Sequence, residues 1–160
     1  LPNYTSNNHK MNWNRFREVA NKLEKSKDKI IADGGIAGKN VICTLSDGDQ
    51  YGFYFLGRSY NKEAMVYRFF PGNPLASTDA NGIHEGLLVW SEKYADDDPK
   101  YLYIEGKQIE RDTLKYKDGP NKGKCELYDK DLYDYFKAKS DQYTNKLNNE
   151  KKEQLEKNKI

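Results

Sequence analysis

Short runs in the middle of the chain alternate between apolar and polar side chains, and this alternation constrains the fold more than any other feature. Between residues 41 and 128 the runs are rich in tyrosine, phenylalanine and β-branched residues, and polar or glycine-containing segments separate them. A period of two is typical of β-strands with one buried face. The sequence therefore predicts a twisted antiparallel β-meander of about six strands.

Turn residues mark the ends of the expected strands. Residues 46–49 read Ser-Asp-Gly-Asp, and they connect 41–45 to 51–55 as a hairpin. Pro-Gly-Asn-Pro at 71–74 ends a third strand at 65–70. Later runs lie at 87–90, 101–104, 108–109, 113–117 and 124–128, which fixes the strand count to within one or two.

An amphipathic helix is expected before the strands. Asn12 is a suitable N-cap, and the Asp-Gly-Gly run at 33–35 is a suitable stop, so the helix should span 12–32. The apolar stripe at three- and four-residue spacing consists of Trp13, Phe16, Ala20, Leu23 and Ile30. This stripe is the face that we expect to pack on the sheet.

A second helix is expected after the strands, with Asp129 or Asp131 as its cap. Its apolar stripe consists of Leu132, Phe136, Tyr143 and Leu147. After Asn148 the only apolar residues are Leu155 and Ile160. We therefore expect a flexible segment at 1–11, a single domain at 12–148, and a solvated helical or frayed tail at 149–160.

These elements predict an α+β fold in which the N-terminal helix packs on the antiparallel meander and the C-terminal helix closes an edge or stands beside it. The order of one helix followed by a meander is similar to the outline of cystatin-like domains. That resemblance lies in the architecture only, because no sequence motif accompanies it.

Composition narrows the function. The 160 residues carry a formal net charge of +2, so a strong field that would attract nucleic acid or anionic lipid is not indicated. We therefore regard nucleic acid as an unlikely partner. No apolar run reaches the roughly 18 residues needed to span a bilayer. Abundant Lys, Asn and Tyr with few Arg suggest an AT-rich genome, such as that of a low-GC bacterium or its phage.

The first residues favour export. The chain as given begins with Leu1, and the polar run at 3–8 resembles the stalk that follows a signal or lipid-attachment site. We expect an extracellular or cell-surface location with a possible lipid tether. Cys43 and Cys125 both lie in expected strands. They are either buried thiols or a disulfide that closes a loop of about 80 residues.

The residues for catalysis are few. His84 and Glu85 lie at the end of the irregular 71–86 stretch, and Arg68 lies one strand earlier, a set that suits a small hydrolase or nuclease. Against this alternative, adjacent residues on a strand point to opposite faces. The acidic turn at 95–99 lacks the ligand spacing of a calcium loop, and the glycine run at 34–39 lacks that of a phosphate loop. We expect no metal or cofactor.

Surplus tyrosines favour a binding function, because not every phenol can be buried with a hydrogen-bond partner. The candidate surfaces are the aromatic sheet face and the 71–86 loop, and the candidate residues are Tyr54, Tyr101, Tyr103, Asn73, Asn81 and His84. The favoured function is a non-enzymatic module that recognises another protein. A further alternative is a cytosolic antagonist carried by a mobile element.

Overall fold

The computed structural model describes residues 35–57, 62–72, 77–79 and 82–160. The flexible segment expected at 1–11, the helix expected at 12–32, and the candidate residues Asn73 and Asn81 lie outside the described residues.

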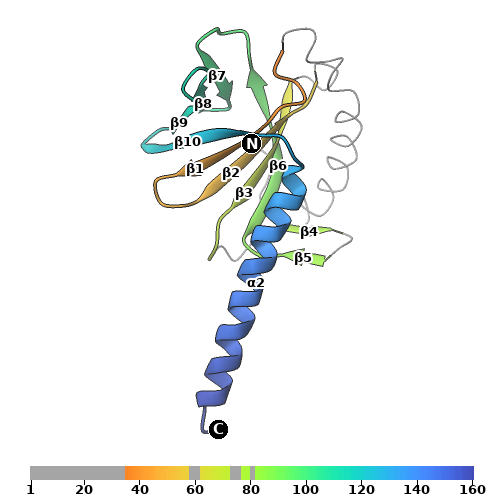
Figure 1. Ribbon diagram of the computed structural model, residues 1–160, viewed down its shortest axis with the longest axis vertical. Helices are drawn as coiled ribbons and strands as arrows, with labels where there is room; N and C mark the ends of the chain where they lie inside the picture. Colours follow the sequence, from red (N-terminus) through yellow and green to blue (C-terminus); the bar gives the residue numbers. More distant parts are fainter. Residues whose placement is uncertain (1–34, 58–61, 73–76, 80–81) are drawn as a thin grey trace.

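Eight antiparallel strands form a closed barrel, in the order β1, β10, β9, β8, β7, β6, β3, β2 and back to β1. The strands are β1 (Asn40–Leu45), β2 (Gln50–Phe55), β3 (Glu63–Phe69), β6 (Leu87–Ala95), β7 (Tyr101–Ile104), β8 (Lys107–Glu110), β9 (Lys115–Asp118) and β10 (Asn121–Tyr128). A separate two-stranded sheet, β4 (Ser77–Asp79) with β5 (Gly82–His84), occupies part of the expected 71–86 loop. Figure 1 shows the barrel and the helix α2 (Leu132–Lys157), which continues well beyond it.

The predicted α+β arrangement, a helix on an open meander of about six strands, is wrong. The first and last strands pair with each other, with Val41 opposite Leu127 and Cys43 opposite Cys125. This pairing removes both free edges of the sheet, which an open meander would leave exposed. Alternation along the chain reports which face each residue takes, but it does not report whether distant strands meet.

The barrel interior is filled by side chains. On β2, Tyr51, Phe53 and Phe55 face inward, where Phe53 stacks on both of its neighbours at ring-centroid distances of 5.7 and 6.4 Å. Tyr54 and Leu56 belong to the second apolar cluster, on the outside. The inner rings make the barrel a packed core rather than a channel.

Helix α2 covers part of the outer face. Asp131 is its N-cap and accepts a hydrogen bond from the backbone N–H of Tyr133 at 2.8 Å, which confirms one of the two predicted caps. Leu132 and Phe136 are buried in the outer cluster. Phe136 lies against Gly52 of β2, where a Cβ atom would collide with its ring. The bare backbone at Gly52 therefore sets where the helix can dock.

Cys43 and Cys125 form a disulfide between β1 and β10. Their Cα atoms are 3.8 Å apart, and 82 positions separate them in the sequence. Both side chains belong to the inner core cluster. The bond therefore joins the first and last barrel strands at the seam where the sheet closes.

Candidate functional site

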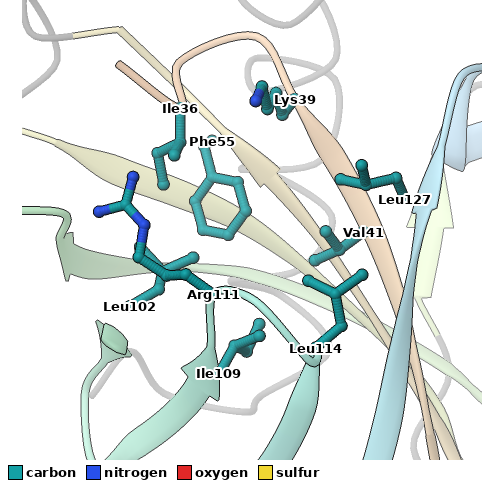
Figure 2. A pocket seen from close by; sticks show the side chains of 9 residues that line it. All are labelled: Ile36, Lys39, Val41, Phe55, Leu102, Ile109, Arg111, Leu114 and Leu127. Atoms are coloured by element: carbon teal, nitrogen blue, oxygen red, sulfur yellow. The ribbon is translucent and has the colours of Figure 1, made fainter. Parts of the chain in front are cut away.

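An apolar pocket of about 220 Å³ opens at one end of the barrel. At this end β1 and β7 begin and β2 and β8 finish. Its lining residues are Ile36, Lys39, Val41, Phe55, Leu102, Ile109, Arg111, Leu114 and Leu127. Figure 2 shows the apolar side chains around the hollow, with Lys39 and Arg111 at its periphery.

The inner end of the pocket is closed by the core. Phe55 and Ile109 are each 1% exposed, and Val41 is also buried. The ring of Phe55 is fixed by an edge-on contact with Tyr94 at 5.1 Å, and the Tyr94 hydroxyl donates to the carbonyl oxygen of Leu56 at 2.6 Å. The floor of the pocket is thus rigid and apolar, so a ligand cannot pass deeper into the barrel.

The rim of the pocket exposes an inward-facing leucine. Leu127 lies opposite Val41 in the β1–β10 pair and follows Cys125 by two residues, which places it on the inner side of its strand. Yet 63% of Leu127 is exposed. A large apolar side chain that points inward and still meets solvent indicates that this end of the barrel is incompletely filled.

A tight turn at residues 36–39 forms a second part of the rim. Gly38 has a φ of 85°, a conformation that glycine adopts without strain, and its N–H donates to the carbonyl oxygen of Phe55 at 2.7 Å. The N–H of Lys39 donates to the carbonyl oxygen of Ile36 at 3.0 Å. These bonds hold Ile36 over the pocket and place Lys39 at its edge.

Leu114 completes the rim in a strained conformation. Its φ of 61° lies in the left-handed region, which is costly for a branched side chain. Two backbone hydrogen bonds of 2.8 Å hold it there, one to the carbonyl oxygen of Glu110 and one from the N–H of Cys125. The strain is therefore imposed by the strands on either side, and it directs a half-buried leucine at the pocket.

The two cations at the pocket, Arg111 and Lys39, differ in whether other groups of the chain balance their charge. One guanidinium nitrogen of Arg111 donates to the backbone carbonyl oxygens of Asp96 and Asp98 at 2.8 and 3.0 Å. Backbone N–H groups of Lys100 and Tyr101 hold the pKa of Asp98 below its ordinary value, and the charge of Arg111 adds to this. Lys39 is exposed and makes no ion pair within the described ranges.

Tyr101 and Tyr103 lie together on the outer face of β7. Their ring centroids are 6.0 Å apart, and the ammonium of Lys100 lies 5.3 Å from the ring of Tyr101. Tyr103 is 40% exposed. Tyr54 shares neither surface nor neighbours with this pair, because it is 5% exposed in the outer cluster with α2.

The residues considered for catalysis do not meet. His84 is 2% exposed and packs edge-on against Tyr133 of α2, outside the barrel. The carbonyl oxygen of Glu85 accepts from the Ser140 hydroxyl at 2.7 Å. The guanidinium of Arg68 instead lies over the ring of Tyr51, a member of the inner cluster, at 5.1 Å. An imidazole and a guanidinium so placed do not face one substrate.

The pocket residues were not singled out by the sequence. Leu114 and Leu127 each occur in a charged context, Asp-Thr-Leu-Lys and Cys-Glu-Leu-Tyr, where a lone leucine gives no periodic signal. The one clue to the orientation of Leu127 was its position two residues after Cys125, because residues i and i+2 of a strand lie on the same face.

Other site types find no support in the described part of the chain. No group of three or more His, Cys, Asp or Glu side chains that could hold a metal ion occurs there. No helix in it has the length and apolarity to cross a membrane.

Comparison of the chain with protein families, with curated proteins and with solved structures finds no match in any of the three.

Proposed function

We propose that the protein is a non-enzymatic binding module that takes the apolar part of a small ligand into the pocket at the end of the barrel. The observation that carries this proposal is the exposure of Leu127 on the inner side of β10. A ligand that covers it would remove apolar surface from water without any change in the fold.

The size of the pocket limits the ligand. An apolar cavity of about 150 Å³ is enough to hold benzene, and this pocket measures about 220 Å³. The packed rings of the core close its inner end. The fitting group is therefore compact, roughly six to eight carbon atoms by that comparison, and a long chain would remain partly outside.

Binding of hexan-1-ol, followed by the methyl NMR signals of Leu127 and Val41, tests this proposal. Leu127→Asn should weaken binding by roughly fivefold, because it removes apolar area from the rim. Leu155→Asn is the matched control, since Leu155 is 61% exposed on α2 and Leu127 is 63% exposed. Equal binding by both variants, or shifts spread over the whole barrel, would contradict the assignment.

We also propose that the protein acts in an oxidising compartment, at the cell surface or outside the cell. The Cys43–Cys125 disulfide supports this, because such bonds persist in oxidising compartments and are rare in the cytosol. Alkylation in denaturant, applied directly to the cells that make the protein, tests it: Cys43 and Cys125 should resist alkylation even in the unfolded chain until a reductant is added. Immediate alkylation would instead favour the cytosolic alternative.

Recognition of another protein through the outer face of β7 is a second candidate. The pair formed by half-buried Tyr101 and exposed Tyr103 beside Lys100 favours it, because tyrosines are enriched in protein interfaces. A partner bound there should be lost on replacement of both tyrosines by serine. It should be retained in Leu127→Asn, which separates this surface from the pocket.

A further inference from the structure

We infer that the ligand of the barrel pocket is a small carboxylate, with its apolar body inside the pocket and its anionic group beside Lys39. This inference rests on the proposed function and names the ligand class. It follows from the placement of cations at a pocket whose walls are otherwise apolar.

Seven of the nine described side chains that line the pocket are hydrocarbon, and the other two are the cations Lys39 and Arg111. Among the residues that the structure describes, no carboxylate lines the pocket. A neutral apolar ligand would leave the ammonium of Lys39 without an anionic partner, whereas a cationic ligand would be repelled by both Lys39 and Arg111. A ligand with an anionic end matches both the walls and the rim.

The carboxylates nearby are already engaged. Asp96 forms an ion pair with Lys62 at 2.8 Å. The Asp98 side chain accepts from the N–H groups of Lys100 and Tyr101 at 2.7 and 3.0 Å and faces the charge of Arg111. Arg111 is therefore partly balanced from within the chain. Lys39 has no ion-pair partner in the described ranges, so it is the cation left to meet a ligand.

Lys39 also has a fixed backbone. Its N–H donates to Ile36, and its carbonyl oxygen accepts from the N–H of Phe55 at 3.1 Å. Both partners line the pocket. The ammonium therefore extends from a rigid point at the edge of the hollow, and only its own side chain has to be ordered when an anion binds.

Matched six-carbon probes test the inference: hexanoate, hexan-1-ol and hexylamine, with methyl NMR signals of Val41 and Leu127 as the readout. Hexanoate should bind about two- to fivefold more tightly than hexan-1-ol, the range expected of a solvent-exposed ion pair, and hexylamine should bind most weakly. The preference for hexanoate should shrink in high salt, which screens an exposed pair.

Lys39→Gln should remove the preference for hexanoate and leave hexan-1-ol binding unchanged. Lys117→Gln, which makes the same charge change at an exposed position of β9 outside the pocket, should retain it. Arg111 is not substituted, because it holds the loop at Asp96 and Asp98.

The two failures are distinguishable. Binding of hexan-1-ol with equal or weaker binding of hexanoate would overturn the carboxylate assignment and leave the pocket intact as a site. An unchanged preference in Lys39→Gln would also overturn it. No methyl shift with any of the three probes would overturn the proposed function itself, and would mean that another part of the chain or a second copy fills the pocket.

Discussion

The ammonium of Lys107 lies inside the barrel, 2.8 and 2.7 Å from the two carboxylate oxygens of Glu92. The Glu92 side chain is fully buried, and one of its oxygens also accepts from the indole N–H of Trp90 at 2.8 Å. The ring of Tyr51 lies 5.8 Å from the ammonium. Both charges are thus removed from water, and each depends on the other.

Lys107→Met should therefore lower the free energy of unfolding by about 3–5 kcal/mol, because it leaves a buried carboxylate without its counter-ion. Adding Glu92→Gln should recover much of that loss, since glutamine carries no charge and its carbonyl oxygen can still accept from Trp90. Urea unfolding of Lys107→Met, of Glu92→Gln and of the double variant measures this. If the losses of the two substitutions simply added, the coupling of the pair would be refuted.

Two buried tyrosines should respond to loss of their hydroxyl in opposite directions. The Tyr116 hydroxyl is buried without a hydrogen-bond partner among the described residues, and burial raises the pKa of this phenol. Tyr116→Phe should stabilise the fold by about 1 kcal/mol. Tyr94→Phe should cost about 1 kcal/mol, because the Tyr94 hydroxyl bonds Leu56. Thermal or urea unfolding checks both, and a loss of stability in Tyr116→Phe would point to an undetected partner.

Reduction of the disulfide should destabilise the barrel by about 4–5 kcal/mol, by the loop-entropy relation for the 82-residue separation of Cys43 and Cys125. The reduced wild-type chain is the best sample, because it leaves the buried side chains in place. Urea unfolding with and without reductant gives the difference. A change much below 1 kcal/mol would show that β1 and β10 remain close in the unfolded chain.

The hairpins could be predicted because their information is local. Residues 46–49 are a turn sequence, and the structure pairs Thr44 with Gln50 around them. Barrel closure could not be predicted in this way, because β1 and β10 are far apart in the sequence and alternation is the same in open and closed sheets. The two cysteines held the missing information: if Cys43 and Cys125 are bonded, the first and last strands must be neighbours.

Charged residues in the strands made some inward-facing positions unrecognisable from the sequence. In β8 the sequence Lys-Gln-Ile-Glu resembles an exposed strand, yet Lys107 and Ile109 are both buried. The alternation of faces along β8 would place Lys107 on the same inward face as Ile109, but a lysine is almost never buried unless it is paired. Its partner Glu92 lies on another strand, so the exception is visible only when β6 and β8 are placed in space.

Gly52→Ala should displace α2, because the new Cβ would collide with the ring of Phe136. The expected effect is a loss of about 1–3 kcal/mol, as for overpacking elsewhere. Gly35→Ala is the control, since a Cβ there meets its nearest atoms at 3.9 Å. Unfolding measurements on Gly52→Ala combined with Phe136→Leu decide the cause: removal of the ring at position 136 should relieve the loss, whereas an unrelieved loss would place the defect within the strand.

The ion pair of Asp96 with Lys62 should contribute stability only above the acidic range. Burial alone would raise the pKa of Asp96, but the hydrogen bond and charge of Lys62, together with backbone hydrogen bonds from Asp96 and Ile36, outweigh burial, so the pKa lies below its usual value of 3.8. A carboxyl group of this kind stabilises the fold above its unfolded-state pKa, and the contribution is lost as pH falls through the lower, folded-state value. Asp96→Asn should therefore be less stable than wild type near neutral pH, and the gap should narrow as pH falls below 3.8. Lys62→Met should show the same narrowing, measured by urea unfolding at each pH, because it removes the same interaction from the other side. A gap that stays constant down to low pH would assign the effect to packing of the loop instead of to charge.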